Sequence, residues 1–389
     1  MKLLRILAIE TSCDETAIAL IEASGGLKNP HFKILENLVA SQIKVHQPFG
    51  GVVPNLAKRE HLKNLPILFK KIFNVRASAV QKLSSILRTS AVKNIDLIAV
   101  TVGPGLEPCL WTGINFAQEV YEDLRRLEHG STRKRKIKLL GASHLEGHLY
   151  SFLLNSKSPK IKSKILFPAI ALLVSGGHTI LLLMNDLTRL KKLGETRDDA
   201  VGECFDKVAR LLDLPYPGGP EIEKLSKKGN AKAINFPRPM LNQKNYDFSF
   251  SGLKTAVLYY LRKTYESTKK DENTKKKKQK MISLIDKADI AASFQEVAFE
   301  TLIKKTLRAV KEFQARTIIV AGGVAANKTL AKMFKENIKK NKIKVNLIIP
   351  PLEFCTDNAA MIGVSAYFNF LQNKKYKLMA NSNLNINSK

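Results

Sequence analysis

No stretch of the chain offers twenty uninterrupted apolar residues, so the sequence predicts no membrane span. Acidic residues, rather than a small-residue cleavage site, follow the short apolar run at the N-terminus, which argues against a signal peptide. Only four cysteines are present, far apart and without CxxC spacing, which argues against a zinc ribbon and suits a reducing compartment. We therefore expect a globular cytoplasmic protein.

Acidic residues are also scarce. The 389 residues include 34 Asp and Glu against 64 Lys and Arg, which gives a formal net charge of +30. Such an excess suits a polyanionic partner such as nucleic acid, but a lysine-rich genome would also produce it, and charge alone favours neither explanation. The basic residues cluster in 131–138, 269–280 and 339–344, and the second cluster, which is of low complexity, is expected to be an exposed insertion.

The most informative stretch is Phe167–Asp186, where a Ser-Gly-Gly-His-Thr segment (175–179) separates two apolar runs. It predicts two buried strands whose turn lets the backbone approach a ligand closely, although an ordinary hairpin turn has the same pattern. Residues 3–22 repeat the arrangement of strand, polar turn and strand. A duplicated lobe predicts an α/β, two-lobed actin-like, Hsp70 or sugar-kinase (ASKHA) fold, with a mixed sheet in each lobe and a ligand in a central cleft.

The expected lobes follow from this repeat. Residues 1–143 would form the N-terminal lobe, and residues 144–358 the C-terminal lobe with its lysine-rich insertion. A helix over about 359–373 is expected to pack back on the first lobe. The polar composition of residues 375–389 predicts a disordered tail.

A possible metal site lies at His144-Leu145-Glu146-Gly147-His148. If this segment is helical, its two histidines are four residues apart, share one face and can bind one metal ion. Glu146 lies about 200° around the helix from His144, so it cannot take the general-base position of a zinc protease. A pair of surface histidines remains the alternative.

Further glycine turns follow predicted strands or helices. The turn at 103–106 runs from a strand into a helix, a geometry that presents backbone N–H groups to an anion. A second turn, 217–220, follows a helix that is predicted over Gly194–Leu214. A third, at 321–327, precedes a helix that begins near Asn327 and suits the sugar or phosphate of a nucleotide.

Several motifs together resemble one family, the tRNA threonylcarbamoyladenosine transferases of the TsaD type, formerly described as glycoproteases. They are collinear over about residues 3 to 365, and the HxEGH and SGGHT forms resemble the bacterial or organellar type. The matching motifs are IETSCDET (9–16), GGVVPNLAKREH (50–61), GPGL (103–106), HLEGH (144–148), LLVSGGHT (172–179), DDAVGECFDK (198–207), YPGGP (216–220), FPRPM (236–240), DFSFSGLKT (247–255), AGGVAAN (321–327) and EFCTDNAAMI (353–362).

The resemblance implies transfer of a threonylcarbamoyl group from threonylcarbamoyl-adenylate to N6 of adenosine 37 in tRNAs that read codons beginning with A. It implies that His144, His148 and Asp357 bind one divalent metal ion per subunit, iron(II) or alternatively zinc. The bacterial type implies helper proteins, an inactive paralogue of the TsaB type and a small ATPase of the TsaE type, whereas the mitochondrial type works alone as a dimer, and the sequence leaves this choice open. The implied adenylate site consists of Leu173, Val174, Ser175, Gly176, Gly177, Asp206, Gly219, Glu223 and Asn327.

Asp14 and Glu15 in the first turn are our hypothesis for catalytic groups near the attacking amine, and Asp14 is the better candidate base. The sequence departs from the family at Glu107-Pro108-Cys109 and Trp111, where small residues are usual. Because proline is tolerated in a first helical turn, we expect the fold to survive this departure. Close packing of that helix, and any partner surface on it, are left open.

Two other functions fit parts of the pattern. A small-molecule kinase or ATPase of the same superfamily would share the fold but would need no metal ligands at His144, His148 and Asp357. A non-catalytic scaffold resembling the inactive paralogue would lack the HxEGH motif, which is intact here. The older peptidase interpretation rests on two histidines and is disfavoured by the position of Glu146.

Overall fold

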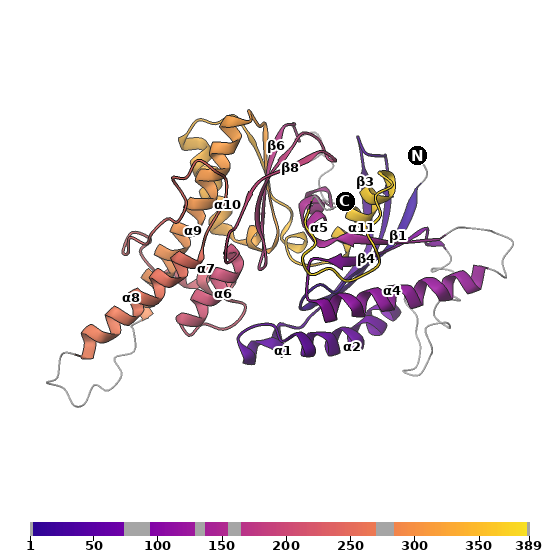
Figure 1. The fold of residues 1–389 in the computed structure, drawn as a ribbon, viewed down its shortest axis with the longest axis horizontal. Helices are drawn as coiled ribbons and strands as arrows, with labels where there is room; N and C mark the ends of the chain where they lie inside the picture. The colour runs from indigo at the N-terminus through magenta and orange to yellow at the C-terminus, as the bar shows by residue number, and fades with distance from the viewer. Residues whose placement is uncertain (1–2, 74–93, 129–136, 155–164, 270–283, 387–389) are drawn as a thin grey trace. The chain divides into compact units, whose positions relative to one another are not determined.

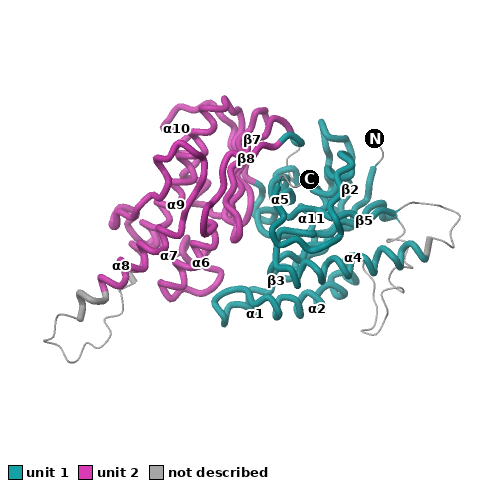
Figure 2. Tube along the Cα trace, viewed as in Figure 1, with its two compact units in different colours: residues 1–164, 187–189, 350–389 teal, residues 165–186, 190–349 magenta. Residues whose placement is uncertain are grey.

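The chain forms two compact units, which are coloured separately in Figure 2. The computed structural model describes residues 3–73, 94–128, 137–154, 165–269 and 284–386. Unit 1 comprises residues 1–164, 187–189 and 350–389, and unit 2 comprises residues 165–186 and 190–349.

Each unit contains one five-stranded sheet, and the two sheets have the same topology, β3-β2-β1-β4-β5 and β8-β7-β6-β9-β10 (Figure 1). In each sheet the first three strands pair antiparallel, and the last two add in parallel on the other side of the first strand. The predicted duplication of a mixed sheet is confirmed. The strands are β1 (Leu4–Glu10), β2 (Glu15–Ser24), β3 (His31–Ser41), β4 (Leu97–Gly103), β5 (Lys138–Ser143), β6 (Ala169–Val174), β7 (Thr179–Met184), β8 (Leu190–Glu195), β9 (Thr317–Ala321) and β10 (Asn346–Ile348).

Helices connect and cover these strands. Those of unit 1 are α1 (Ile43–His46), α2 (Pro54–Ile72), α4 (Glu107–Glu128), α5 (His144–Tyr150) and α11 (Ala359–Leu371), with 3₁₀ turns η1 (Gln47–Phe49), η3 (Ser151–Leu154) and η6 (Leu352–Phe354). Those of unit 2 are α6 (Val201–Leu211), α7 (Gly218–Ser226), α8 (Ser251–Lys269), α9 (Leu284–Glu312) and α10 (Lys328–Lys340), with η5 (Gly323–Ala326).

Helices cover both faces of the sheet of unit 1. Successive side chains of β1 point to opposite faces and so contact different helices. Leu7 and Ile9 belong to the core cluster that contains Phe69 of α2. Ala8 points the other way and meets α11, where a Cβ placed on Gly363 would lie 3.5 Å from the Ala8 Cβ. Helix α11 therefore packs directly on the first sheet, although it follows unit 2 in the sequence.

The units divide the chain differently from the lobes expected at residues 143 and 358. Segments 144–164 and 350–358 both lie with unit 1. The physical reason is packing: every residue of α5 is buried, and α5 contacts α11 as well as the adjoining strands. As a result, all three predicted metal ligands belong to one unit.

The expectation of a disordered tail is wrong for residues 375–386. Tyr376, Leu384 and Ile386 are buried, and the first two join the core cluster of unit 1. The polar composition of the tail concealed these apolar contacts, which are too few and too widely spaced to form a periodic pattern.

Most of two of the three basic clusters, residues 131–136 and 270–280, lies outside the described residues. The third cluster, 339–344, covers the end of α10 and the turn after it, where most of its side chains are exposed. Among the described helices, none has the length and apolar character that a membrane crossing requires.

Candidate active site

The two histidines of the HxEGH motif sit on the short helix α5, which starts directly after β5. Ser143 caps this helix, and its Oγ accepts a hydrogen bond from the Glu146 N–H at 3.5 Å. The i,i+4 spacing places His144 and His148 on one face, with ring centroids 4.6 Å apart and planes at 83°. The expected helix and the shared face are both present, and neither histidine is on the surface.

Asp357 completes the cluster from the segment that leads into α11. Its Oδ1 lies 2.9 Å from His148 Nε2 and 3.6 Å from His144 Nε2. One ligand atom from each of the three residues lies within 4.8 Å of the others. Asn358, the next residue, caps α11 by accepting a hydrogen bond from the Met361 N–H, which fixes the backbone beside Asp357.

The donor set fits a divalent metal ion. His148 is buried, and within the described chain neither of its ring nitrogens makes an aligned hydrogen bond, even though Nε2 is 2.9 Å from a carboxylate oxygen. A fully buried imidazole without hydrogen bonds is costly, and coordination of a cation would remove that cost. Two imidazoles and one carboxylate form a combination that binds iron(II) or zinc and leaves coordination positions open.

Glu10 is a site residue that the sequence did not identify. It is fully buried at the end of β1, and it accepts hydrogen bonds from the Ser12 N–H and, at 2.6 Å, from Thr101 Oγ1. Its Oε2 is 3.1 Å from His144 Nδ1. Because a carboxylate can only accept, Nδ1 carries a proton, and when the ring gives up its second proton the lone pair of Nε2 becomes available to a metal. The glutamate was overlooked because it appears in the sequence as the last residue of an apolar strand.

Electrostatics link these groups. Burial disfavours the charged form of His144, but the carboxylates of Asp357 and Glu10 outweigh it and raise the pKa of His144 to about 9. Burial alone would raise the pKa of Glu10, but the attraction and hydrogen bond of His144 lower it below its usual value. Before a metal binds, the site therefore holds more negative charge than positive, which favours a cation.

The two hypothesised catalytic carboxylates lie in the turn between β1 and β2. Asp14 is buried, and its backbone carbonyl accepts a hydrogen bond from the Gln42 N–H at 2.9 Å. Burial raises the pKa of Glu15 well above its usual value, and the nearby charges of Asp357 and Asp14 raise it further. The charge of Asp357 thus acts on Glu15, and the catalytic role of both carboxylates remains a prediction.

In unit 2 the predicted adenylate residues lie around the carboxyl end of β6, on segments that are linked by hydrogen bonds and close backbone contacts. The turn after β6 packs against the start of α6, where the Gly202 N–H donates to Ser175 O at 3.2 Å and the Glu203 N–H donates to Gly176 O at 3.1 Å. A Cβ on Gly202 would lie 2.5 Å from Ser175 O, so only glycine allows this approach. The predicted residues Leu173 and Val174 are buried in β6 itself.

Further hydrogen bonds link α6 to α7, and α7 to the start of α10. Asp206 Oδ1 accepts a hydrogen bond from the Gly218 N–H at 2.7 Å, at the start of α7. Glu223, one turn further along α7, accepts from the Lys328 N–H at 3.1 Å. Asn327 caps α10 through its Oδ1, which accepts from the N–H groups of residues 329 and 330.

The third glycine turn, at residues 321–327, comes back into contact with the end of β6. Gly322 has a φ of 93°, and a Cβ there would lie 2.4 Å from Val174 O. All the predicted adenylate residues therefore lie in one connected part of unit 2. Four glycines in these turns would place a Cβ in open space, with no atom within 4 Å: Gly176, Gly177, Gly219 and Gly323.

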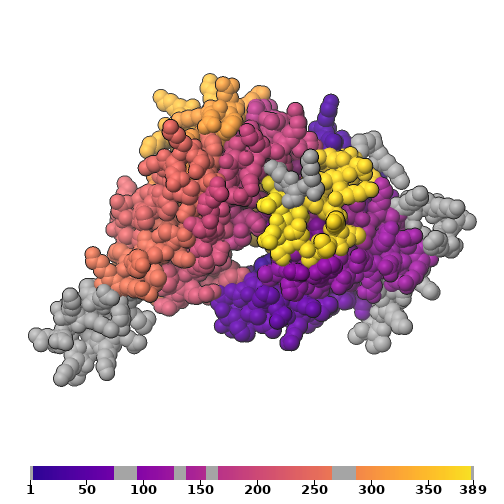
Figure 3. Space-filling view, in the orientation of Figure 1, coloured from indigo at the N-terminus to yellow at the C-terminus, as the bar shows by residue number. Residues whose placement is uncertain are grey.

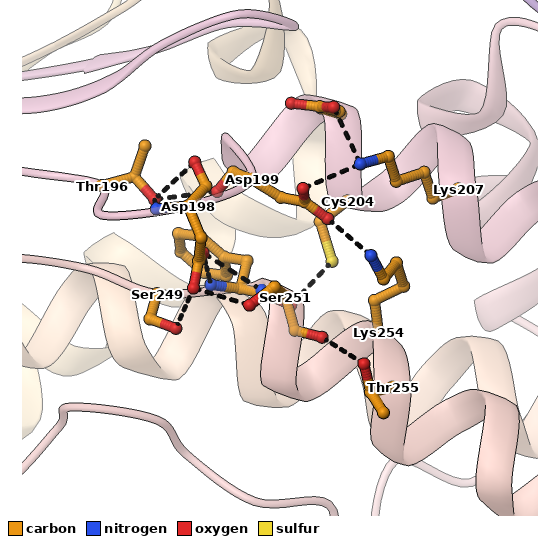
Figure 4. Close-up of polar contacts among 11 residues, drawn as sticks. Thr196, Asp198, Asp199, Cys204, Lys207, Ser249, Ser251, Lys254 and Thr255 are labelled. Carbon is orange, nitrogen blue, oxygen red and sulfur yellow. Dashed lines mark hydrogen bonds and ion pairs between the residues drawn. The ribbon is translucent and has the colours of Figure 1, made fainter.

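The N-terminal side of α6 is anchored to α8 by two acidic residues (Figure 4). Asp198 accepts hydrogen bonds from Ser249 Oγ and Ser251 Oγ at 2.5 and 2.6 Å, and from the backbone N–H groups of residues 250 and 251. Asp199 pairs with Lys207 on α6 at 2.7 Å and with Lys254 on α8 at 3.1 Å. The predicted helix over Gly194–Leu214 is therefore too long at its start. Helix α6 begins at Val201, and the side chains of Asp198 and Asp199, which precede it, bind groups at the start of α8.

The departure at residues 107–111 does not interrupt the fold. Helix α4 begins at Glu107 and holds Pro108 in its first turn. The backbone carbonyl of the buried Cys109 accepts a hydrogen bond from Thr11 Oγ1 at 2.9 Å. The fold survives the departure, as expected, and the close packing left open by the sequence is present at the start of α4, while Trp111 is 36% exposed.

Comparison with known proteins identifies the family. The model of the TsaD family, tRNA N6-adenosine threonylcarbamoyltransferase, matches residues 33–364. The chain is 46% identical over 362 residues to the transferase of this name from Thermosipho africanus, covering 93% of each chain. It is 42% identical over 383 residues to that from Clostridioides difficile, covering 98% of each. The chain belongs to the TsaD family. It is therefore a transferase of the acyltransferase class that acts in tRNA modification, and the predicted family and enzyme class are confirmed.

Solved structures of low sequence identity share the fold. T. kodakarensis HypF has a TM-score of 0.53 at 14% identity, and a full-length HypF in the phosphate- and nucleotide-bound form has 0.51 at 11%. The match covers 95% and 97% of this chain but only 48% and 56% of those chains, so the TsaD-family chain spans about half the length of HypF. At these identities the likeness shows the fold alone, and with the repeated sheet topology it confirms the predicted ASKHA-type α/β fold.

Proposed function

We propose that this chain transfers the threonylcarbamoyl group from threonylcarbamoyl-adenylate to N6 of adenosine 37 in tRNAs that read codons beginning with A. The observation that carries the proposal is the cluster of two buried histidines, His144 and His148, with the half-buried Asp357 in a chain of the TsaD family. A small-molecule kinase of the same fold has no use for this cluster. The open glycines of unit 2 lend further support, since they leave room for a nucleotide beside backbone N–H groups.

In the proposed reaction N6 attacks the carbamoyl carbon, the bond from that carbon to the phosphate oxygen breaks, and AMP leaves with the electron pair. We assign the proton lost from N6 to Asp14, as the general base. The backbone of the Ser175–Gly177 turn, with Asp206, Glu223 and Asn327, would orient the donor. A divalent cation would supply Lewis-acid polarisation of an oxygen of the donor and offset charge on the departing phosphate.

We propose iron(II) as the bound ion, with zinc as the alternative, because two histidines and one carboxylate with open positions suit iron(II) in particular. By analogy with the family, an inactive paralogue of the TsaB type and a small ATPase of the TsaE type would assist turnover. The four cysteines, all unpaired in the structure, agree with a reaction in the reducing cytoplasm.

The test is direct. The purified, metal-loaded chain would be incubated with threonylcarbamoyl-adenylate labelled in its threonine, with tRNA transcripts that carry A37 or G37, and with or without the two helper proteins. We expect label in the A37 transcript alone and one AMP released per label transferred. Phosphorylation of a small molecule from ATP, with no label in either tRNA, would support the kinase alternative instead.

A second arm addresses the base. Asp14→Asn is expected to abolish transfer while threonylcarbamoyl-adenylate still binds, because the amide keeps the shape of the side chain but accepts no proton. Turnover by Asp14→Asn at the rate of the unchanged chain would remove this role from Asp14.

A further inference from the structure

Glu146 lies between the two histidines in sequence but takes no part in the ligand cluster. It is 5% exposed, and its carboxylate is occupied by three donors. Oε1 accepts from Lys374 Nζ at 2.8 Å and from Tyr376 Oη at 3.0 Å, and Oε2 accepts from Ser365 Oγ at 3.3 Å. These contacts explain why it is not a protease-like base, and they attach α5 to the chain that follows α11.

That following chain, residues 374–386, is here called the C-terminal clasp. In the space-filling view the C-terminal residues, coloured yellow, lie on the visible face of unit 1 (Figure 3). The Asn381 N–H donates to Val102 O at 2.8 Å, at the end of β4. A Cβ on Gly103 would lie 2.0 Å from Asn381 O, so the clasp contacts β4 as closely as glycine permits. At the far end of the clasp, the side chains of Leu384 and Ile386 are buried.

Helix α5 depends on such external contacts for its orientation. It has seven residues, about two turns, and a helix of that length has little stability of its own in water. A small rotation of α5 would move both imidazoles away from Asp357, whereas a metal site needs its ligands within about 0.5 Å of the productive geometry. On its ligand-bearing side, Glu10 holds His144 in place.

We propose that the C-terminal clasp, acting through Glu146, fixes the rotation of α5 and so positions the histidines for the metal. Glu146 is thus a positioning residue. Burial raises the pKa of Tyr376 far above its usual value, and the neighbouring Glu146 adds to this, so the phenol stays neutral and keeps donating its hydrogen bond. The inference rests on the proposed function only in assuming that His144, His148 and Asp357 bind a metal.

The experiment measures metal affinity without substrate, so it is independent of whether the chain transfers threonylcarbamoyl groups. Cobalt(II) and iron(II) would be titrated against a chelator of known affinity into the full-length chain and into Glu146→Gln, Tyr376→Phe and Lys374→Met. Lys377→Met is the matched control, because Lys377 lies in the clasp, is exposed and loses the same charge. Thermal unfolding of the metal-free proteins would be recorded alongside.

We expect Glu146→Gln and Lys374→Met to weaken metal binding about 10–100-fold, the usual effect of residues that orient ligands, and Tyr376→Phe to weaken it less. The visible absorption of bound cobalt should shift in Glu146→Gln, and Lys374→Arg should restore affinity. Lys377→Met should bind metal normally. Tyr376→Phe removes only one oxygen and remains a test if Glu146→Gln does not fold. Unchanged affinity and cobalt spectrum in the folded variants would overturn the proposal, even if their melting temperatures fell.

Discussion

The first turn of each sheet shows how one topology supports two kinds of chemistry. In unit 1 the turn between β1 and β2 is filled by side chains: Thr11 and Asp14 are buried, and Glu10 lies at its start. In unit 2 the equivalent turn between β6 and β7 contains Gly176 and Gly177, where a Cβ would meet no atom within 4 Å. Strand order and pairing are the same in both, so these two turns differ in their residues and not in the topology around them.

The two sites should therefore respond to different kinds of substitution. The metal cluster of unit 1 is built from two buried histidines and a half-buried aspartate, and other side chains hold the histidines in position, so it is sensitive to the loss of a single polar atom. The predicted adenylate site of unit 2 presents backbone groups at glycines that have open space beside them, so it should be sensitive to added side-chain volume.

Removing a ligand should have the largest effect. His148→Ala takes away the imidazole whose Nε2 lies 2.9 Å from Asp357. We expect metal affinity to fall by more than about 100-fold, because changes around the ligands alone cost 10–100-fold, and transfer activity to fall to background. Elemental analysis of the dialysed protein measures the first and labelled tRNA the second. His31→Ala, on β3 of the same unit, is the control; a full metal complement in His148→Ala would contradict the assigned ligand set.

Adding volume in unit 2 should separate binding from folding. Gly218 and Gly219 are neighbours in α7, but a Cβ on Gly218 would lie 2.4 Å from the Ala209 Cβ, whereas one on Gly219 would meet nothing. We expect Gly219→Leu to fold normally and to bind threonylcarbamoyl-adenylate at least about 10-fold more weakly, because the side chain fills the space left for the ligand. Gly218→Leu should instead lose about 1–3 kcal/mol or more of folding stability.

Calorimetric titration with a non-reactive adenylate analogue, together with chemical denaturation, checks both glycine variants. Adenylate binding by Gly219→Leu at the affinity of the unchanged chain would show that this open space is not the ligand site. Metal content should be normal in Gly219→Leu, because the ligand cluster belongs entirely to unit 1.

The sequence predicted the parts of the structure that depend on local pattern. Buried strands appear as apolar runs between turn residues, so the two hairpins and their duplication could be deduced from residues 3–22 and 167–186. The shared face of His144 and His148 followed from helical spacing. By contrast, Asp357 lies at the other end of the chain, and only the family resemblance joined it to the histidines.

What the sequence could not give depends on contacts between distant segments. The roles of Glu10 and Glu146 exist only because β1, α5 and the clasp meet in the folded unit. Similarly, Asp198 and Asp199 resemble the acidic first turn of a helix in the sequence, but in the folded unit their carboxylates bind groups at the start of α8. A residue used by a distant element carries no local periodic signal.

A smaller effect is expected from the group that orients His144. Glu10→Gln keeps the volume of the side chain but removes the charge that faces Nδ1 at 3.1 Å. Metal affinity should fall about 10–100-fold while the strand stays folded. The same chelator competition that measures the clasp variants applies here. Glu22→Gln, which breaks an ion pair of β2 with Arg5, should leave affinity unchanged; equal losses in both would show a general effect of charge.

The smallest effect should come from the anchor between α6 and α8. Asp198 acts as the N-terminal cap of α8, and Asp198→Ala is expected to cost about 0.5–2 kcal/mol of folding stability, as cap removal generally does. The hydrogen bonds outweigh partial burial and lower the pKa of Asp198. Its contribution is therefore complete above the usual aspartate pKa and is lost as the pH falls through the lowered value, so the two proteins should converge in acid.

Urea denaturation of the unchanged chain and of Asp198→Ala across the acidic range measures that convergence. Asp213→Asn is the control, because Asp213 pairs with Lys287 in the same unit but is largely exposed, and asparagine tolerates its φ of 57°. If α8 is held by the contacts of Asp198, Asp198→Ala loses stability at neutral pH, Asp213→Asn loses little, and both keep full metal content. A fall in metal content in Asp198→Ala would break the contrast between the units, because it would mean that the anchor of unit 2 also supports the ligand cluster of unit 1.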